Sequence, residues 1–216
     1  MRAIQFNDKH TAEDWGLILT AKKRNPPTPK YEKISIDGRD GEIDLSRALT
    51  GEIKYKNTDA SYSFLLSKGT QAEREELLSE IINFVHGQIL NIIEPDDQYH
   101  YIVGDCTVEN VVNNKAYASF TVSADCEPYR YAIEETNRYI SLTSSITDIV
   151  ITNTGTKILI PTLTVNGSVN LTVGSSSVAL SSGQYKLTSL KLKPGATTIS
   201  VSGSGTLIVS YREAIL

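Results

Sequence analysis

Only one segment of this 216-residue sequence has the periodicity of an α-helix. The segment "GTQAEREELLSEIINFVHG" begins with Thr70 and Glu73 at the spacing of a capping box, in which each side chain binds the other residue's free backbone N–H. Gly87 suits the end of the helix. Apolar side chains recur every three or four positions, which places them on one face: Leu77, Leu78, Ile81, Ile82 and Val85. The pattern therefore predicts a helix over 70–86 that packs by this face against a sheet.

Most of the remaining sequence has the alternation typical of β-strands. Before the helix, "KYEKISIDG" and "GEIKYKNTDASYSFLLS" read as strands, and "KRNPPTPK" suits an extended connector because its three prolines lack backbone donors. After the helix, "QILNII", "YHYIVGDC" and "KAYASFTVSADC" read as strands, the last two joined by a turn at Asn113-Asn114. The final part holds seven short strands, among them "YKLTSLKL". They are separated by the turn signals "NTGT", "NG", "SSG" and "KPGA", a pattern typical of a β-sandwich.

The two ends of the sequence differ in charge. Residues 139–216 contain five basic and two acidic side chains, whereas residues 1–138 contain 16 basic and 23 acidic ones. A change of this kind indicates a domain boundary, which we expect near "EPYRYAIEETNRY". The expected fold class is mainly β with one helix, in a first domain over 1–132 and a second, all-β domain over 133–216. The net charge of −4 gives no sign of a basic surface for nucleic acid.

The charged segment "IDGRDGEIDLS", Ile36 to Ser46, is the first candidate for a functional site. Its acidic residues do not keep the spacing of a calcium loop, and an arginine would place a positive charge among the ligands. Two tight Asp-Gly turns are the favoured interpretation, so the charged side chains would face outward. These side chains are Asp37, Arg39, Asp40, Glu42 and Asp44.

The search for catalytic, metal-binding and cofactor-binding motifs gives no candidate. The three histidines are not at metal-ligand spacing, and both a Gly-x-Ser-x-Gly elbow and a P-loop are missing from the sequence. We expect His86 to complement the helix dipole as an imidazolium, and His100 to be an exposed strand position. The acidic stretches Glu94–Asp97 and Glu134–Glu135 are interpreted as solvated loop charges. The sequence therefore favours a protein that is not an enzyme and needs no cofactor or metal.

The two cysteines are interpreted as structural. Cys106 and Cys126 are too few for a disulfide framework and suit small buried positions in strands. Counted back from the expected turn at Asn113-Asn114, Cys106 would face Thr121 and Val122 and not Cys126.

Four segments resemble the distal tail (Dit) proteins of long-tailed bacteriophages. "IDGRDGEIDLS" resembles the Gly-Arg-Asp-Gly…Asp-Leu motif near the start of that family. "FTVSADCEPYRY" is similar to the Cys-Asp-Pro-Tyr segment that closes its first domain, although Glu127 stands where aspartate is usual. "NTGTKILIPTLTVNG" and "LKPGATTISVSGSGTLIVSYREAIL" are similar to its second domain and its ending. Their order and spacing fit over nearly the whole chain.

The resemblance implies a first domain of split β-barrel type that assembles into a hexameric ring, and a galectin-like second domain outside it. Such a ring would join the tail tube protein to the tail-tip protein and receptor-binding protein of a virion, after synthesis in the host cytoplasm. It would bind no specific nucleic acid and would not insert into a membrane. The charged turn would then contact a neighbouring subunit, with Arg39 facing a carboxylate.

Two other functions are weighed against this one. The Ser/Thr-rich second domain could be a carbohydrate-binding module for host cell-wall sugars, but sugar sites usually offer an aromatic platform, and only Tyr185 and Tyr211 follow Tyr139. A cell-wall hydrolase would need a pair of facing carboxylates, which the sequence does not mark.

Overall fold

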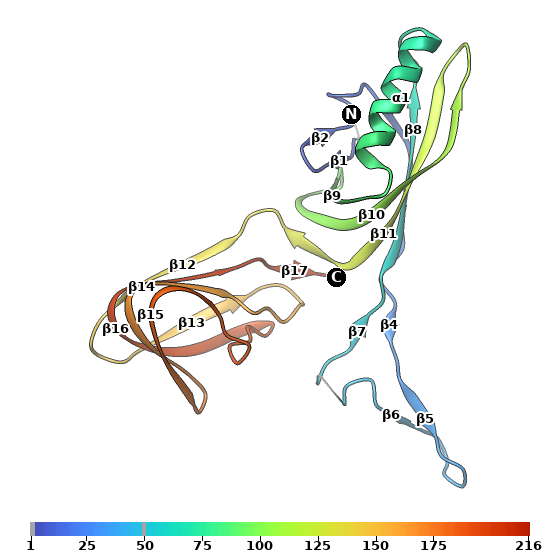
Figure 1. Cartoon of the computed structure of the whole chain (residues 1–216). Coiled ribbons are helices and arrows are strands. Elements are labelled where there is room, and N and C mark those ends of the chain that lie inside the picture. Colours follow the sequence, from blue (N-terminus) through green and yellow to red (C-terminus); the bar gives the residue numbers. More distant parts are fainter. Residues whose placement is uncertain (1–2, 49–50) are drawn as a thin grey trace. The chain divides into compact units, whose positions relative to one another are not determined.

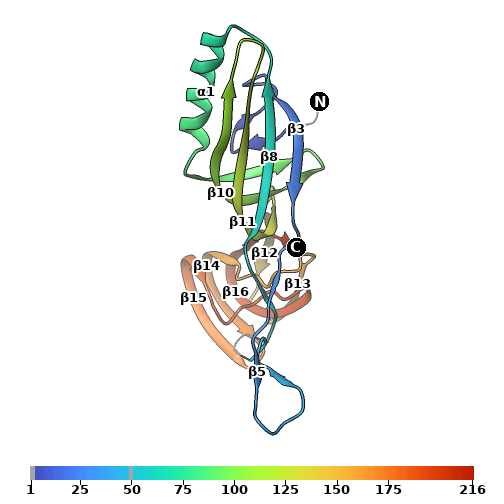
Figure 2. The same cartoon turned by 90° about the vertical axis from the view of Figure 1, so that its right-hand side faces the viewer.

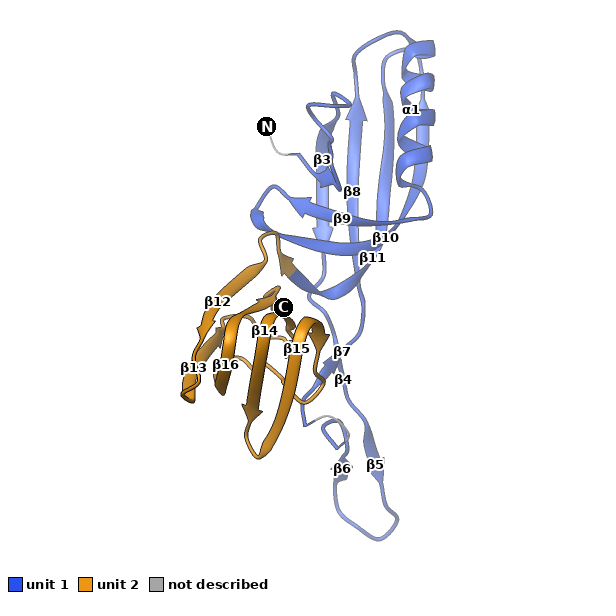
Figure 3. Ribbon diagram, turned by 60° about the vertical axis from the view of Figure 1, so that its left-hand side comes forward, with its two compact units in different colours: residues 1–130 blue, residues 131–216 orange. Residues whose placement is uncertain are grey.

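The computed structural model describes residues 3–48 and 51–216. The chain divides into two compact units, residues 1–130 and residues 131–216 (Figure 3). Each unit encloses its own cluster of buried apolar side chains. The expected fold class is confirmed: both units are built from β-strands, and the described residues contain one helix.

Unit 1 is a curled antiparallel sheet with a helix beside it (Figure 2). Its strands hydrogen-bond in an order that differs from the chain order: β2 (Lys9–His10), β1 (Gln5–Phe6), β9 (Gln88–Glu94), β10 (Asp97–Asn113), β11 (Ala118–Ala132), β8 (Thr58–Leu66) and β3 (Ile18–Arg24). The longest described strands of the unit, β10 and β11, lie at the centre of this order. In β8 every second side chain from Thr58 to Leu66 is buried, so one face of the sheet forms the core.

The helix α1 (Gln71–Val85) forms where the capping pattern predicts it. Glu73 N donates to Thr70 Oγ1 (3.3 Å), and Thr70 N donates to Glu73 Oε2 (2.7 Å), so both halves of the capping box are present. Leu78, Ile81 and Val85 are buried, whereas the predicted face residues Leu77 and Ile82 are half-buried. The buried face is thus narrower than the apolar face that the sequence predicts, because α1 packs against β9 and β10 along one line.

Aromatic side chains fill the core of unit 1. Phe6 packs edge-on against Tyr62 and Phe64, with ring centroids 6.2 and 6.3 Å apart. Trp15 packs edge-on against Phe84 of α1 at 5.5 Å, and its indole N–H donates to Glu80 Oε1 (3.2 Å). These edge-on contacts add to the burial of apolar area and hold the helix on the sheet.

The turn between β10 and β11 lies further along the chain than the expected position at Asn113-Asn114. Asn114 N donates to Tyr117 O (3.0 Å), and Asn114 Oδ1 accepts from the N–H groups of Ala116 and Tyr117. The turn therefore spans four residues, because the asparagine side chain satisfies its backbone donors. The expected position of Cys106 opposite Thr121 and Val122 stays a prediction.

His86 ends the helix, as expected, and its ring also contacts β10. His86 is the C-cap of α1, and its Nδ1 accepts a hydrogen bond from Val108 N (3.0 Å). The ring therefore accepts a hydrogen bond from β10, a contact that the sequence pattern does not reveal. Gly87 follows with φ of +70°, as a glycine at the end of a helix does.

Unit 2 is built around one very long strand. β16 (Gly195–Tyr211) pairs with β13 (Thr147–Asn153) through its first half and with β12 (Thr136–Leu142) through its second half. On its other side it pairs with β14 (Thr162–Val173), which pairs with β15 (Ser176–Lys186). Within unit 2, Ala132 N donates to Glu213 O (2.9 Å), next to the short strand β17 (Ala214–Ile215). These strands enclose one core, and a galectin-like relationship stays a prediction.

Two of the predicted turns of unit 2 lie inside strands. Asn166-Gly167 is part of β14 and Ser181-Ser182-Gly183 is part of β15. The register of β14 with β15 shifts between Val165 and Ser168, so the glycine forms a bulge and not a hairpin turn. The predicted strand over "YKLTSLKL" ends at Lys186, and Leu192 instead forms an isolated bridge with Leu159.

Glycines bring β14 and β16 into unusually close contact. A Cβ atom at Gly205 would lie 1.9 Å from Asn166 O, and one at Gly203 would lie 2.0 Å from Ser168 O. Both have positive φ, 99° and 149°. The close approach occurs where β16 changes partner from β13 to β12, so the glycines allow the sheet to bend at that point.

Candidate subunit-interface arm

The residues predicted to contact another subunit lie on an extension of unit 1, which we call the arm (residues 25–57; Figure 1). The arm leaves the sheet at the end of β3 and returns at the start of β8. It contains two short ribbons: β4 (Pro29–Lys30) with β7 (Lys54–Tyr55), and β5 (Lys33–Ser35) with β6 (Glu42–Asp44). None of its described side chains, 25–48 and 51–57, is buried.

The tip of the arm holds the charged turn. Gly38 and Gly41 have φ of +83° and +78°, and Arg39 N donates to Ile36 O (3.2 Å). The prediction of two tight Asp-Gly turns is therefore confirmed. Asp37, Arg39 and Asp40 are exposed in the turns, whereas Glu42 and Asp44 follow in β6. The five predicted side chains thus share one hairpin.

The hairpin β5–β6 has one apolar face and one charged face. Ile34 lies opposite Ile43, whereas Lys33 lies opposite Asp44 on the other face. Ile34 and Ile36 are each 45% exposed. A two-stranded hairpin is at best marginally stable alone, so this apolar face has the character of a contact surface. Sequence reasoning chose the charged residues and missed the isoleucines, although the alternation in "KISID" could have revealed them.

Some charged side chains of the arm have partners within it. Lys33 Nζ lies 3.6 Å from Glu42 Oε2, and about half of each side chain is exposed, so this pair adds at most about 1 kcal/mol to stability. Hydrogen bonds from the hydroxyl and backbone N–H of Ser46 lower the pKa of Asp44, and the charges of Lys33 and Arg47 add to this effect. Asp44 therefore stabilises the turn that follows β6.

The root of the arm is tied to the sheet by hydrogen bonds and one aromatic contact. Thr58 Oγ1 donates to Asn25 O (2.6 Å), and Asn25 N donates to Asp59 O (3.3 Å). Tyr55 packs edge-on against Tyr129 of β11 with ring centroids 6.2 Å apart. These contacts fix where the arm begins while its outer hairpin stays exposed.

Ion pairs close the curled sheet at the root of the arm, in what we call the seam. Glu94, at the end of β9, is 4% exposed. Its Oε2 lies 3.1 Å from Lys22 Nζ and 3.4 Å from Arg24 Nε on β3, and Tyr62 OH donates to its Oε1 (3.0 Å). Burial and the nearby Glu94 carboxylate raise the pKa of Tyr62, so its hydroxyl remains a donor. The seam joins two strands that do not pair through their backbones.

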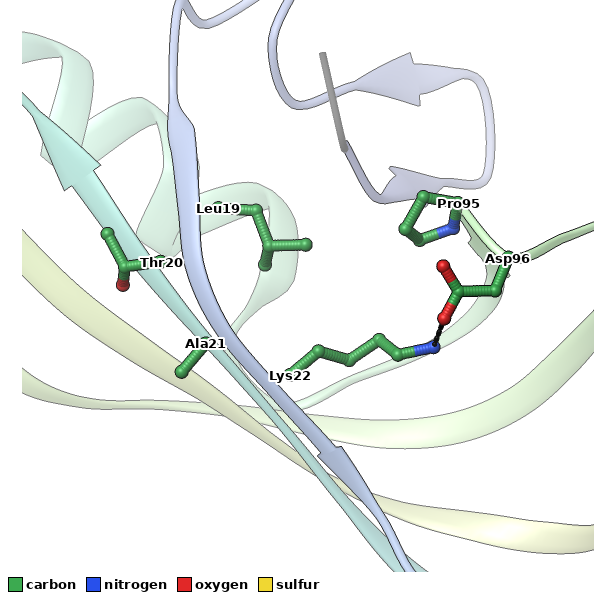
Figure 4. A pocket seen from close by; sticks show the side chains of 6 residues that line it. All are labelled: Leu19, Thr20, Ala21, Lys22, Pro95 and Asp96. Carbon is green, nitrogen blue, oxygen red and sulfur yellow. Dashed lines mark hydrogen bonds and ion pairs between the residues drawn. The ribbon is translucent and has the colours of Figure 1, made fainter.

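The interpretation of Glu94 as a solvated loop charge is therefore wrong. Leu90, Ile92 and Glu94 are in phase along β9 and are all buried, so the alternation of the strand predicts an inward carboxylate. Asp96 keeps the expected exposure and pairs with Lys22 Nζ at 2.8 Å (Figure 4). Beside this pair lies a recess of about 80 Å³ between β3 and Pro95.

A second charged group lies at the start of β10. His100 Nδ1 is 2.8 Å from Asp97 Oδ1, and Arg130 Nη1 donates to Asp97 Oδ2 (2.7 Å). Burial opposes ionisation of Asp97, but the hydrogen bond from His100 and the charges of His100 and Arg130 lower its pKa. The expectation that His100 is simply exposed is corrected, because the β9–β10 turn brings Asp97 next to it.

Both cysteines are buried and free, as the sequence analysis expects. Burial is the main cause that raises the pKa of Cys106 and of Cys126 to about 12. Within residues 3–48 and 51–216, histidine, cysteine, aspartate and glutamate side chains form no group of three or more that could hold a metal ion. In that same part of the chain, the single helix is too short and too polar to cross a bilayer.

These features define a class: a mainly β protein of two units, with a curled one-helix sheet that carries a long exposed arm. The structure is similar over the full length of both chains to the crystal structure of SPP1 Dit (gp 19.1), with 15% sequence identity and a TM-score of 0.72. That protein is described as a paradigm of the hub adsorption apparatus in phages that infect Gram-positive bacteria. The chain therefore has the fold of a distal tail protein. Neither a protein-family model nor a curated protein sequence matches it.

Proposed function

We propose that this protein is a structural, non-enzymatic hub of a long-tailed phage or prophage tail tip. In this role six copies form a ring through unit 1, between the tail tube protein and the tail-tip protein. Unit 2 lies outside the ring and carries or contacts a receptor-binding protein. The likeness to SPP1 Dit over the whole chain is the observation that supports this role most directly.

The arm supports lateral assembly by its own chemistry. Ile34, Ile36 and Ile43 lie on a hairpin with no core beneath it, and covering them on another subunit would stabilise the contact by roughly 1 kcal/mol each. In a ring each copy presents two different surfaces, so an arm can reach one neighbour while the same copy receives the arm of the other. The predicted contact of Asp37, Arg39, Asp40, Glu42 and Asp44 with a neighbour fits the rim of such an interface, where charges set register more than affinity.

The mass of the purified full-length protein tests this role. Light scattering should give about six times the chain mass of 23.7 kDa, and negative-stain images should show rings. Arg39→Glu should weaken the ring by placing a negative charge among carboxylates. If the ring forms equally well with Arg39→Glu, the charged turn is not part of the interface. A persistent monomer at high concentration, also in the presence of the tail tube and tail-tip proteins, would contradict the hub role.

Carbohydrate binding by unit 2 is the alternative function. Tyr139 on β12 is 74% exposed and could stack on a sugar ring. A recess of about 430 Å³ over β14, β15 and β16, however, has no aromatic side chain among its lining residues. A glycan array with the full chain separates the two functions, because a hub needs no sugar affinity. We rank the hub role first.

A further inference from the structure

Strand β9 carries apolar side chains on both faces of the unit 1 sheet. Leu90, Ile92 and Glu94 point inward, so the residues between them lie on the outer face. On that face Ile89 is 72% exposed and Ile93 is half-buried. Leu90 and Ile92 belong to the apolar cluster of unit 1, whereas Ile89 and Ile93 do not. A strand that is apolar on both faces is typical of a sheet that is covered on both sides.

The neighbouring strand β10 extends this apolar surface. Val103 is half-buried on the outer face and lies opposite Asn91, so Ile89 and Ile93 are its diagonal neighbours. We call Ile89, Ile93 and Val103 the outer patch. Asp105 is exposed on the same face and lies directly opposite Ile89. The outer patch is therefore an apolar surface of two strands with a carboxylate at its border.

The outer patch and the hairpin β5–β6 of the arm have complementary chemistry. The hairpin carries Ile34, Ile36 and Ile43, and both surfaces stay exposed in the single chain, so the chain does not cover one with the other. Arg39 at the tip of the arm and Asp105 beside the outer patch are exposed charges of opposite sign. Within residues 3–48 and 51–216, neither of these two side chains has an ion-pair partner. One chain thus presents both halves of a contact.

We propose that the outer patch of one copy receives the apolar face of the arm hairpin of a second copy. The isoleucines of the arm pack on the outer patch and exclude water from it. Arg39 pairs with Asp105 at the border, where a charge pair sets the register of the contact. The arm and the outer patch are different surfaces, so the contact runs head to tail, as a ring requires.

Cross-linking between two variants of the full-length protein tests this contact. One variant carries Ile36→Cys in the arm, and the other carries Asn91→Cys at an exposed position within the outer patch. A short bis-maleimide should join them, and mass spectrometry of the linked peptides should identify the pair. Ser141→Cys, at an exposed position of β12, is the matched control, and its yield with Ile36→Cys should be roughly tenfold lower. The unchanged protein, whose two thiols are buried, gives the background.

Exchange of the two charges tests the orientation of the contact. Asp105→Arg in the variant with Asn91→Cys, or Arg39→Asp in the variant with Ile36→Cys, should lower the yield of the mixed dimer roughly fivefold. The two substitutions together place opposite charges at the contact again and should restore the yield. Glu134→Arg, at an exposed position of unit 2, is the control and should leave the yield unchanged. A yield that does not recover when both charges are exchanged contradicts the pairing of Arg39 with Asp105.

The outcomes separate this contact from the hub role, on which the inference rests for the presence of neighbouring copies. Equal yields with Asn91→Cys and Ser141→Cys overturn the proposal, as does a link that forms mainly between two arms. Ile89→Asp should abolish the link and melt as the unchanged protein does, because Ile89 is exposed. A link without a ring in light scattering would support the contact and contradict the hub role. A ring without the link would support the hub role and contradict the contact.

Discussion

Lys22 on β3 and Glu94 at the end of β9 form an ion pair, with Nζ 3.1 Å from Oε2, between strands from distant parts of the unit 1 sheet. The arm begins three residues after Lys22, so the pair that closes the sheet also holds the strand from which the arm departs. Closure of the sheet and position of the arm therefore depend on the same buried carboxylate.

Glu94→Gln tests the seam. The substitution keeps an acceptor for Tyr62 but removes the negative charge that faces Lys22 and Arg24, and we expect the free energy of unfolding to fall by about 2 kcal/mol. Urea denaturation of the full chain measures the loss. Asp96→Asn is the control, because Asp96 is exposed and shares the same lysine, and it should cost less than about 1 kcal/mol. If both substitutions lower the free energy of unfolding by the same amount, the burial of Glu94 adds nothing to the strength of its ion pairs.

Thr70→Ala tests the capping box of α1. Two hydrogen bonds between Thr70 and Glu73 disappear or weaken, and we expect a loss of about 1 kcal/mol in the free energy of unfolding. Thermal denaturation followed by far-ultraviolet circular dichroism measures it. Ser79→Ala, on the exposed side of the same helix, should change stability by less than about 0.5 kcal/mol.

Gly205→Ala tests the close approach of β14 and β16. The added methyl group would meet Asn166 O at 1.9 Å in a backbone with positive φ, so we expect a loss of at least about 3 kcal/mol, confined to unit 2. Hydrogen–deuterium exchange locates the change. Gly174→Ala, where φ is +59° and nothing lies within 4 Å of the new methyl group, should cost only about 1 kcal/mol. A small effect at Gly205 would mean that the two strands can separate.

The buried thiols predict a pH dependence of reactivity and stability. Because the pKa of Cys106 and of Cys126 is about 12 in the folded protein against an ordinary value of 9.0, both thiols stay protonated at pH 8 and should react slowly with a disulfide reagent. As pH rises from 9 to 12, thiols of the unfolded chain lose protons while those of the folded chain keep them, so stability should fall in this interval. Ser141→Cys provides an exposed thiol for comparison, and fast reaction of all three thiols in the folded protein would contradict the burial.

Ile34→Asp tests the apolar face of the arm. In the proposed ring the new charge would have to be buried when the hairpin contacts a neighbour, so light scattering should show smaller species than for the unchanged protein. The free energy of unfolding of the chain should change little, because Ile34 has no core beneath it. Val150→Asp, at an exposed position of β13, should leave the ring intact. A stable ring with Ile34→Asp would assign the interface to another surface.

Sequence reasoning predicts α1, the mainly β character and the charged turns, because each depends on neighbouring residues: the capping pair Thr70 and Glu73, and the glycines Gly38 and Gly41. It misses features that depend on distant strands. Glu94 is in phase with Leu90 and Ile92, but its partners Lys22 and Arg24 lie about 70 positions away, so only the fold identifies the ion pairs. Asn166-Gly167 has the composition of a hairpin turn, yet the long pairing of β14 with β16 holds it inside a strand.

The separate cores of the two units have an evolutionary consequence. Residues 1–130 and 131–216 each enclose their own apolar cluster, so a recombination event near the junction would transfer a complete folding unit and leave the other intact. Genomes that exchange segments at such a point can alter unit 2 while they inherit an unchanged unit 1.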